Sequence, residues 1–420
     1  MKWPTAPIEE VAPAKAATIR FLPNDIVWHL TLDQIESNTG NIINKKVGPV
    51  REAGASSYVF DIGNVLYSKL RPYLNKVVCP SEPGIATTEL IPLRPIPNVL
   101  DRQFLTYYLR STHFLAFANV AVAGVKMPRL IMPKFWKHRV PLPPLSEQRR
   151  IVEILDQADA LRKKRAEADA KAARILPALF YKMFGDPLAL VTSGDGIPLG
   201  DLNVDLQNGF ACGEKDVEGG IPHLRMNNID DAGVLNFELI RTVPLDRDVE
   251  RYRLVKGDVL FMGTNSEDKI GKTCLFLPPD DRTYLFSNHL TRLRVSDSRI
   301  TPEYLAGLLH LLWSKRFFPS IAKRWVNQST VSQSALTALR VPLPAERSLQ
   351  VFTTAFQNLL SLRAQRVRSG QILDQSFAIL LNRAFTGDLT AKWREAHMKE
   401  LLQEMEQQAK ALDIKENAGA

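Results

Sequence analysis

A five-residue sequence occurs twice in this chain and divides it into two similar halves. Residues 139–143 read Arg-Val-Pro-Leu-Pro, and residues 340–344 repeat them 201 positions later. Each copy opens a segment of about 40 residues with helical periodicity, and the segments end alike, on Phe-Gly-Asp and on Phe-Thr-Gly-Asp. A repeat at a fixed offset is typical of a duplicated structural unit. The sequence therefore predicts a globular block, a long helix, a second block and a second long helix.

The match continues more loosely upstream of each helix. Residues 63–66, Gly-Asn-Val-Leu, correspond to residues 257–260, Gly-Asp-Val-Leu, now at an offset of 194. The changed offset indicates that the blocks differ in their loops, as expected if the blocks serve specificity and the helices serve assembly. The predicted parts are, in order, a first block at 1–140, a first helix at 141–186, a second block at 187–340, a second helix at 341–388 and a C-terminal tail at 389–420.

The first helix is expected to begin near Ser146, because Ser is a favoured N-cap and Pro143-Pro144 bars a helix before it. Pro177 should kink or break this helix one to two turns before Phe184. The apolar residues fall at helical spacing and form one stripe, which consists of Ile151, Leu155, Ala158, Leu161, Ala168, Ala172, Ile175 and Leu179.

The second helix carries a similar stripe, and Ser369-Gly370 is its expected weak point. Its apolar positions are Phe352, Phe356, Leu359, Leu362, Leu373, Phe377, Leu380 and Ala384. At a rise of 1.5 Å per residue, each helix is roughly 50–60 Å long. Helices of matching length can bury their stripes on each other, so the sequence favours an antiparallel pair that forms a coiled coil. The alternative is that each helix packs only on its own block.

Both blocks combine strand-like and helix-like stretches. Short runs rich in strand-forming residues, punctuated by Gly, Pro and Asp, occur at 58–60, 64–67, 273–277 and 290–295. Helical stretches at 103–110 and 302–312 close the two blocks. The predicted fold class is therefore α/β, more narrowly α+β, with two mixed domains separated by two long antiparallel helices and an internal pseudo-repeat.

The charge of the chain favours a polyanionic partner, since the net charge is +9 and the pI is near 9.4. Many soluble proteins are mildly basic, so the distribution of charge is more informative than the total. Residues 1–140 hold 17 Lys and Arg against 10 Asp and Glu, whereas residues 187–340 hold 18 against 19. The first block is therefore expected to rely on phosphate contacts, and the second on base contacts from local clusters.

Motifs for catalysis are missing from the sequence. Residues 270–273 resemble the end of a phosphate-binding loop, but Ser266 stands where that motif needs glycine. There is no GxGxxG, HExxH or Asn/Asp-Pro-Pro-aromatic motif, the histidines show no ligand spacing, and no CxxC pair occurs. We therefore expect no catalytic, metal or cofactor site. Since no long apolar run and no apolar leader occur either, we expect a cytoplasmic protein without membrane spans.

Polar and basic residues gather on strand–turn segments, where recognition usually resides on a rigid scaffold. Lys and Arg hold phosphates, and Arg and Asn also bind base edges through paired hydrogen bonds. A solvated hairpin or an Asn turn would explain the same residues without such a function. Residues 124–129 of the first half occupy a place equivalent to residues 324–330 of the second. The candidate nucleic-acid-binding residues are Lys69, Arg71, Tyr73, Lys76, Lys126, Arg129, Arg225, Asn227, Asn228, Thr264, Asn265, Ser266, Lys269, Lys272, Arg324 and Gln328.

These segments resemble the specificity subunits of type I restriction-modification systems. The most specific match is the proline-rich stretch at 141–151, Pro-Leu-Pro-Pro-Leu-Ser-Glu-Gln-Arg-Arg-Ile. Further matches lie at 63–73, 224–229, 257–261, 270–272 and 385–389, so the resemblance covers roughly residues 20–395. The second copy departs from the family pattern, because residues 344–350 lack its Pro-Pro-Leu-x-Glu-Gln. This departure leaves the start of the second helix open.

The resemblance implies a division of labour within a complex. Two target-recognition domains each read half of a split sequence in double-stranded DNA, and the two helices set the gap and dock methyltransferase subunits, expected to be two. Those partners would carry S-adenosylmethionine, and a separate ATP-driven motor subunit would cut unmodified DNA, while this chain would be non-catalytic. Two alternatives stay open: a coiled-coil scaffold that does not bind DNA, and part of a fused restriction or methylation enzyme.

Overall fold

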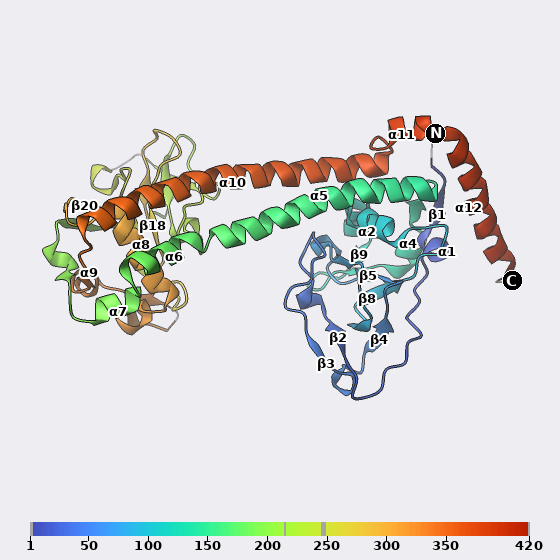
Figure 1. The fold of residues 1–420 in the computed structure, drawn as a ribbon, viewed down its shortest axis with the longest axis horizontal. Helices are drawn as coiled ribbons and strands as arrows, with labels where there is room; N and C mark the ends of the chain where they lie inside the picture. Colours follow the sequence, from blue (N-terminus) through green and yellow to red (C-terminus); the bar gives the residue numbers. More distant parts are fainter. Residues whose placement is uncertain (1–2, 214–215, 245–248, 327, 419–420) are drawn as a thin grey trace. The chain divides into compact units, whose positions relative to one another are not determined.

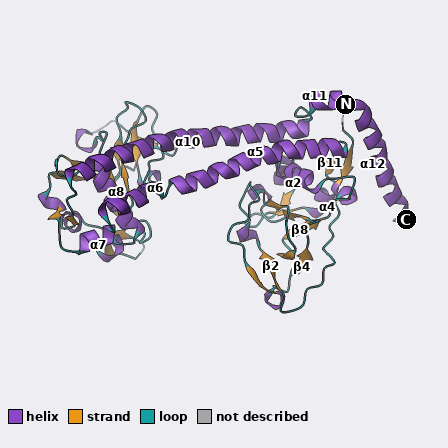
Figure 2. Ribbon diagram, in the orientation of Figure 1, coloured by secondary structure: helices purple, strands orange, loops and turns teal. Residues whose placement is uncertain are grey.

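The computed structural model describes residues 3–213, 216–244, 249–326 and 328–418. The chain divides into two compact units (Figure 1): unit 1 comprises Met1–Lys164 and Gly370–Ala420, and unit 2 comprises Arg165–Ser369. Both units combine helices and strands (Figure 2), which confirms the predicted mixed fold class. Each unit contains one of the two predicted blocks and part of each long helix.

The block of unit 1 is built on two small sheets. Their strands are β2 Ile26–Leu30, β3 Val47–Pro49, β4 Ser57–Phe60, β5 Val65–Ser68, β6 Val77–Val78, β7 Gly84–Thr87 and β8 Leu90–Leu93. One sheet has the order β3-β2-β7-β4, with β2 parallel to β7, and the other has the order β6-β5-β8 and is antiparallel. The strands predicted at 58–60 and 64–67 are therefore confirmed as β4 and β5.

Short helices pack on these sheets around an aromatic core. They are α1 Ile8–Val11, α2 Arg102–Arg110, α3 Thr112–Val120 and α4 Met132–Trp136. Tyr67 of β5 stacks on Phe135 of α4, with ring centroids 5.6 Å apart, and both rings are buried. The carboxylate of Asp101 caps α2 by accepting from two backbone amides of its first turn. The helix expected at 103–110 is therefore confirmed as α2.

The described part of the unit 2 block contains three sheets of three or four strands. Their strands are β13 Val204–Asn208, β14 Ile221–Leu224, β15 Arg241–Val243, β16 Val259–Met262, β17 Thr264–Asn265, β18 Thr273–Leu275, β19 Leu285–Phe286, β20 Leu290–Val295, β21 Lys323–Arg324 and β22 Ser329–Thr330. The sheet orders are β13-β20-β16-β18, β15-β14-β19 and β17-β22-β21. The helices are α7 Pro187–Thr192, α8 Pro302–Ser314 and α9 Gln333–Thr337. The strand expected at 290–295 and the helix expected at 302–312 are confirmed as β20 and α8.

The duplication is visible in how each block closes. An antiparallel strand pair joins the beginning of each block to its end. In unit 1 this pair is β1 (Thr5–Pro7) with β11 (Arg139–Pro141), and in unit 2 it is β12 (Ile197–Pro198) with β23 (Arg340–Val341). The repeated Arg-Val-Pro-Leu-Pro therefore begins as the closing strand of its block and then leads into a long helix.

The turns before β5 and β16 also match. Asn64 Oδ1 accepts a hydrogen bond from the amide of Asp61 at 3.1 Å, and Asp258 Oδ2 accepts one from the amide of Val255 at 2.8 Å. Both residues therefore hold a tight turn by bonding to the backbone three residues earlier. The correspondence of residues 63–66 with 257–260 thus has a structural basis.

The predicted long helices are α5 (Leu145–Ala172) followed by α6 (Ile175–Phe184), and α10 (Glu346–Thr386). The starts of α5 and α10 lie 201 residues apart, so the second helix keeps the repeat despite its different motif. The first helix breaks earlier than expected, before Pro177, because proline has no amide hydrogen for the carbonyl four residues back. The second helix runs unbroken through its expected weak point.

The two long helices pair antiparallel within each unit, as predicted. In unit 1, Leu155 of α5 shares a buried cluster with Phe377 and Leu381 of α10. In unit 2, Phe180 of α6 lies against Phe352 of α10, with ring centroids 5.6 Å apart. Each pair therefore buries apolar side chains from both helices.

The predicted apolar stripe is wrong in its middle part. The stripe positions that are exposed are Leu161, Ala168, Ile175 and Leu362. Charged and polar side chains make contacts there: Arg162 Nε lies 2.7 Å from Asp374 Oδ1 in unit 1, and Arg165 Nη1 lies 3.3 Å from Ser369 Oγ in unit 2. Apolar spacing alone therefore did not identify which residues join the helices.

The C-terminal tail is helical and packs on unit 1. It forms α11 (Ala391–Ala396) and α12 (Met398–Ala418). Glu404 Oε2 of α12 accepts a hydrogen bond from the amide of Ser146 at 3.0 Å, so α12 supplies a partner for the first turn of α5. No helix in the described parts of the chain is long and apolar enough to span a membrane.

The Glu of the proline-rich stretch is the centre of a buried network in unit 1. Glu147 is 0% exposed and accepts hydrogen bonds from Arg394 Nε at 2.7 Å and from the Thr390 hydroxyl at 2.6 Å. The indole N–H of Trp3 donates to its second carboxylate oxygen at 3.0 Å. Residues near the beginning, the middle and the end of the chain therefore meet at one carboxylate.

Candidate nucleic-acid interface

Unit 1 brings together the two predicted segments of the first block. Residues 69–71 follow β5, and the hairpin of β9 (Val122–Ala123) and β10 (Arg129–Leu130) lies beside them. The amide of Arg71 donates to the carbonyl of Pro128 at 2.7 Å, and the amide of Leu130 donates to the carbonyl of Lys69 at 2.9 Å. We call this pair of segments the unit 1 surface.

The candidate side chains of the unit 1 surface differ in how open they are. Arg71, Tyr73, Lys126 and Arg129 are exposed, and Lys69 and Lys76 are half-buried. Lys76 Nζ donates to the carbonyl of Leu32 at 2.7 Å, and Arg129 Nη2 lies 3.0 Å from Glu89 Oε1. Lys76 and Arg129 therefore already have partners within unit 1, whereas no such partner is seen for Lys69, Arg71, Tyr73 and Lys126 among the described contacts.

Unit 2 repeats this arrangement. β17, which follows β16, pairs antiparallel with β22, and β22 pairs with β21, so residues 264–265 lie beside the hairpin. The predicted equivalence of 124–129 with 324–330 is therefore confirmed, although residue 327 lies outside the described residues. The Thr264 hydroxyl lies 3.2 Å from that of Thr330, and Arg324 pairs with Glu267 at 2.9 Å. Ser266 is partly buried and Gln328 is exposed.

A cleft of about 830 Å³ lies in unit 2 next to this region. The predicted residues that line it are Arg225, Asn227, Asn265, Lys269 and Lys272. They come from a turn after β14, from β17 and from the residues before β18, and Arg225 and Lys272 are 47 positions apart in the sequence. The fold therefore gathers half of the candidates of the second block in one place.

Asn228 differs from the prediction, because it serves the fold rather than a ligand. It is 0% exposed, and its Oδ1 accepts from the amide of Arg225 at 2.8 Å. Its Nδ2 donates to the carbonyl of Asn236, also at 2.8 Å. The Asn turn that was the alternative explanation therefore holds for Asn228, whereas its neighbour Asn227 is exposed at the cleft.

Lys272 is also less available than predicted. Its side chain is 5% exposed, its ammonium pairs with Asp231, and it lies 5.0 Å from the ring centre of Trp313. The hydrogen bond from Lys272 lowers the pKa of the Asp231 carboxyl below its usual value. Lys272 therefore fixes one wall of the cleft.

Several further residues line the cleft that were not predicted from the sequence, namely His223, Arg241, Ser287, Asn288 and His289. His223 and Arg241 are direct partners across β14 and β15, whereas Ser287, Asn288 and His289 lie in the turn between β19 and β20. The one local signal was spacing, because His223 and Arg225 are two residues apart and so lie on the same face of an extended chain. Burial lowers the pKa of His223 to about 4, so its imidazole is neutral near pH 7.

The two adjacent asparagines give a direct test of this assignment. Asn228→Ala should lower the free energy of unfolding of unit 2 by about 1–3 kcal/mol, because it leaves buried backbone groups without partners. Asn227→Ala should change it by less than about 0.5 kcal/mol, because the side chain is exposed. Urea unfolding of the two variants measures both effects. Equal stability of the two variants would contradict the assignment.

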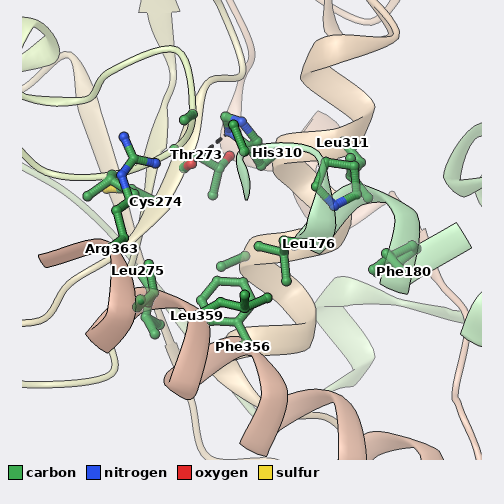
Figure 3. A pocket seen from close by; sticks show the side chains of 18 of the residues that line it. Leu176, Phe180, Thr273, Cys274, Leu275, His310, Leu311, Phe356, Leu359 and Arg363 are labelled. Carbon is green, nitrogen blue, oxygen red and sulfur yellow. Dashed lines mark hydrogen bonds between the residues drawn. The ribbon is translucent and has the colours of Figure 1, made fainter. Parts of the chain in front are cut away.

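A second cavity of unit 2 has a different character. It has a volume of about 490 Å³, and Leu176, Phe180, Leu311, Phe356 and Leu359 are among its apolar lining residues (Figure 3). Figure 3 also shows Arg363 at the cavity; its guanidinium lies 2.5 Å from the carboxylate of Asp230. An apolar lining of this kind suits helix packing more than a phosphate or a base edge.

Among the described residues, no group of three or more His, Cys, Asp or Glu side chains is arranged to hold a metal ion. The strongest polar arrangements are therefore the unit 1 surface and the unit 2 cleft, which combine cationic and amide side chains. Such side chains bind phosphates and base edges.

Comparison with known proteins agrees with this chemistry. A family model described as type I restriction modification DNA specificity domain matches residues 37–169. A putative type I restriction enzyme MjaX specificity subunit from Methanocaldococcus jannaschii is 29% identical over 192 residues, which is 45% of this chain and 44% of the relative. The type I restriction enzyme StySPI specificity subunit of Salmonella potsdam is 24% identical over 331 residues, 72% of this chain and 68% of the relative. The chain is therefore similar to the specificity subunits of type I restriction enzymes.

Solved structures extend the family likeness to the fold. The S subunit of a type I restriction-modification system from M. genitalium covers 91% of this chain and 96% of its own, with a TM-score of 0.54 and 13% identity. A chain from a structure of a type I R-M system covers 92% of this chain and 98% of its own length, with a TM-score of 0.56 and 20% identity. The match to the MjaX subunit spans less than half of that relative's length. The second block lies outside the residues that the family model matches.

Proposed function

We propose that this chain reads a split sequence in double-stranded DNA as the specificity subunit of a type I restriction-modification complex. The observation that carries the proposal is an arrangement that occurs once in each unit. In unit 1 the segment after β5 pairs with the β9–β10 hairpin, and in unit 2 the segment after β16 pairs with the β21–β22 hairpin. Both copies present Lys or Arg side chains beside this junction, yet their sequences differ. Two different readers on one repeated scaffold suit a target with two unlike halves.

The proposal assigns the catalytic work to partners. The paired helices would dock methyltransferase subunits, and two nearly equivalent helix starts favour two such subunits. S-adenosylmethionine would bind to those subunits and ATP to a motor subunit, while this chain would act in the cytoplasm without a cofactor. The catalytic and cofactor-binding motifs that the sequence lacks are the reason for this division.

The two alternatives lead to different results. A scaffold without DNA binding would have no use for a cleft that presents Arg225, Lys269 and Asn265. A fused enzyme would transfer methyl groups without a partner. The decisive experiment maps DNA methylation in cells with and without the gene, and then assays the purified chain alone. We expect an interrupted motif that disappears with the gene, and no methyl transfer by the chain alone.

The two units should act on separate halves of that motif. Replacing Lys69 and Arg71 with Ala should weaken or alter methylation through one half-sequence only, and replacing Asn227 and Asn265 should act through the other half. A side chain that reads a base is worth about 1–3 kcal/mol of discrimination. Methylation mapping of each double variant in the assembled complex measures this. Effects of one variant on both half-sequences would show that the two units do not read separately.

A further inference from the structure

The unit 2 cleft has a polar face whose composition is set by strand register. His223 of β14 is the partner of Arg241 in β15 and of Leu285 in β19. One step along, Leu224 pairs with Phe286, which brings Arg225 level with Ser287. Side chains two apart on a strand share a face, so His223 and Arg225 lie on the same side of the sheet. Both of them, with Arg241 and Ser287, line the cleft.

Three buried polar atoms on this face have no partner in the described structure: His223 Nε2, Arg225 Nε and Ser287 Oγ. His223 and Ser287 are each only 5% exposed. A buried polar atom without a hydrogen bond is costly, so such atoms in a native protein require an explanation. Arg225 Nε and the Ser287 hydroxyl carry a hydrogen and can donate it, and His223 Nε2 donates when the imidazole is protonated on that nitrogen. What the face lacks is an acceptor.

The charge around this face is positive. Arg225 and Arg241 lie close enough that repulsion from Arg241, after burial, lowers the pKa of Arg225. Lys269 is exposed at the same cleft. The nearby carboxylates are engaged, because Asp231 pairs with Lys272 and Asp216 lies 3.7 Å from Arg241. Like charges held together with unpartnered donors are stabilised when an anion binds between them.

We propose that the unit 2 cleft binds a phosphate group, held by Arg225, His223 and Ser287 with support from Arg241. The proposal rests on the proposed function for its source, which is the DNA backbone. Shape favours the backbone over the bases, because base edges lie at the floor of a groove and are reached by protruding elements. Side chains inside a concave cleft instead meet the outward-facing phosphates. The role assigned to Arg225 therefore differs from the base contacts that the net charge of the second block favoured.

The test uses the full chain and two probes. The first probe is inorganic phosphate, with hydrogen exchange followed at residues 221–225 and 285–289. The second is a duplex that carries the mapped motif, with its affinity measured over a range of salt concentrations. Arg225→Gln should abolish phosphate protection, and it should reduce the slope of log affinity against log salt by about 0.9, the value for one phosphate contact. The loss should be the same on the motif and on a scrambled second half-sequence.

Matched variants keep the result interpretable. Arg282→Gln removes an exposed arginine of the same unit that pairs with Asp280 and does not line the cleft, and it should change neither readout. Ser287→Ala should reduce phosphate protection with no change of charge, so it serves if Arg225→Gln fails to fold.

Each outcome decides the proposal. Phosphate protection with an unchanged salt slope would identify a free anion as the source and overturn the backbone assignment. A loss confined to the true motif, or a changed methylation motif, would make Arg225 a base reader and overturn the proposal. Loss of both readouts in Arg225→Gln but not in Arg282→Gln supports it. If the wild-type chain binds phosphate but no duplex, the anion site stands and the proposed function fails.

Discussion

Replacing Leu155 with Asp is expected to disrupt the core of unit 1 and to release the chain from the methyltransferase subunits proposed as its partners. Leu155 is 0% exposed and packs in a cluster with Ile151 of α5 and with Phe377 and Leu381 of α10. Truncation of a buried leucine to alanine costs about 2–5 kcal/mol, and a carboxylate in an apolar core adds a desolvation cost. We therefore expect a loss of more than about 3 kcal/mol in the free energy of unfolding of unit 1.

Leu161 provides a matched control on the same helix. It belongs to the stripe that the sequence predicts, but it is 56% exposed. Leu161→Asp should therefore change the stability by less than about 0.5 kcal/mol. Hydrogen exchange of the α5 amides and co-purification with the methyltransferase subunits measure both variants. If Leu161→Asp lost the partners while keeping the fold, Leu161 would belong to the docking surface. If Leu155→Asp were as stable as the wild type, the helix pairing in unit 1 would be wrong.

Removing the charge of Arg394 is expected to have an effect of similar size. Arg394 is 8% exposed, and its guanidinium donates to the fully buried carboxylate of Glu147. Breaking a buried ion pair by removing one partner costs about 3–5 kcal/mol, because the remaining charge stays buried without compensation. Arg394→Met keeps most of the volume and removes the charge. Amide exchange in the first turns of α5 and in α11 should rise accordingly.

Two further variants separate charge from packing. The double variant Arg394→Met, Glu147→Leu removes both buried charges of this ion pair, and much of the lost stability should return. Arg150→Met removes one member of an exposed pair with Glu153, which is 54% exposed, and should cost less than about 1 kcal/mol. A double variant no more stable than Arg394→Met would show that the loss comes from packing and not from the charge.

The parts of the fold that follow from local rules were predictable from the sequence. Prolines placed the start of the first long helix, and short runs of strand-forming residues placed β4, β5 and β20. The start of the second long helix was left open, because residues 344–350 depart from the first copy. The apolar stripe failed at Leu161 because spacing shows which residues share a helix face, but not how far along that face the partner helix stays close. Arg162 and Arg165 contact the other long helix. In the sequence, however, they look like charged residues on the solvent-exposed face of a helix.

The candidate site was predictable only where its residues form clusters along the chain. Asn227 and Asn228 look alike in the sequence, yet one is exposed and the other holds a turn, since the difference depends on a carbonyl eight residues away. His223 and Ser287 meet through parallel pairing of β14 with β19, which short-range patterns do not specify. The polar face of the cleft is therefore a product of register between distant strands.

The meeting of Trp3, Glu147 and Arg394 has a consequence for the order in which the protein matures on the ribosome. Unit 2 is one continuous stretch, whereas unit 1 needs residues from both ends of the chain. Domains tend to fold as they emerge during synthesis. Unit 2 can therefore complete its core before Arg394, which lies 247 residues after Glu147, has been synthesised. Premature termination before Gly370 would leave a finished second reader attached to an unfinished first one, so a truncated product would expose the apolar residues of α5 to quality control.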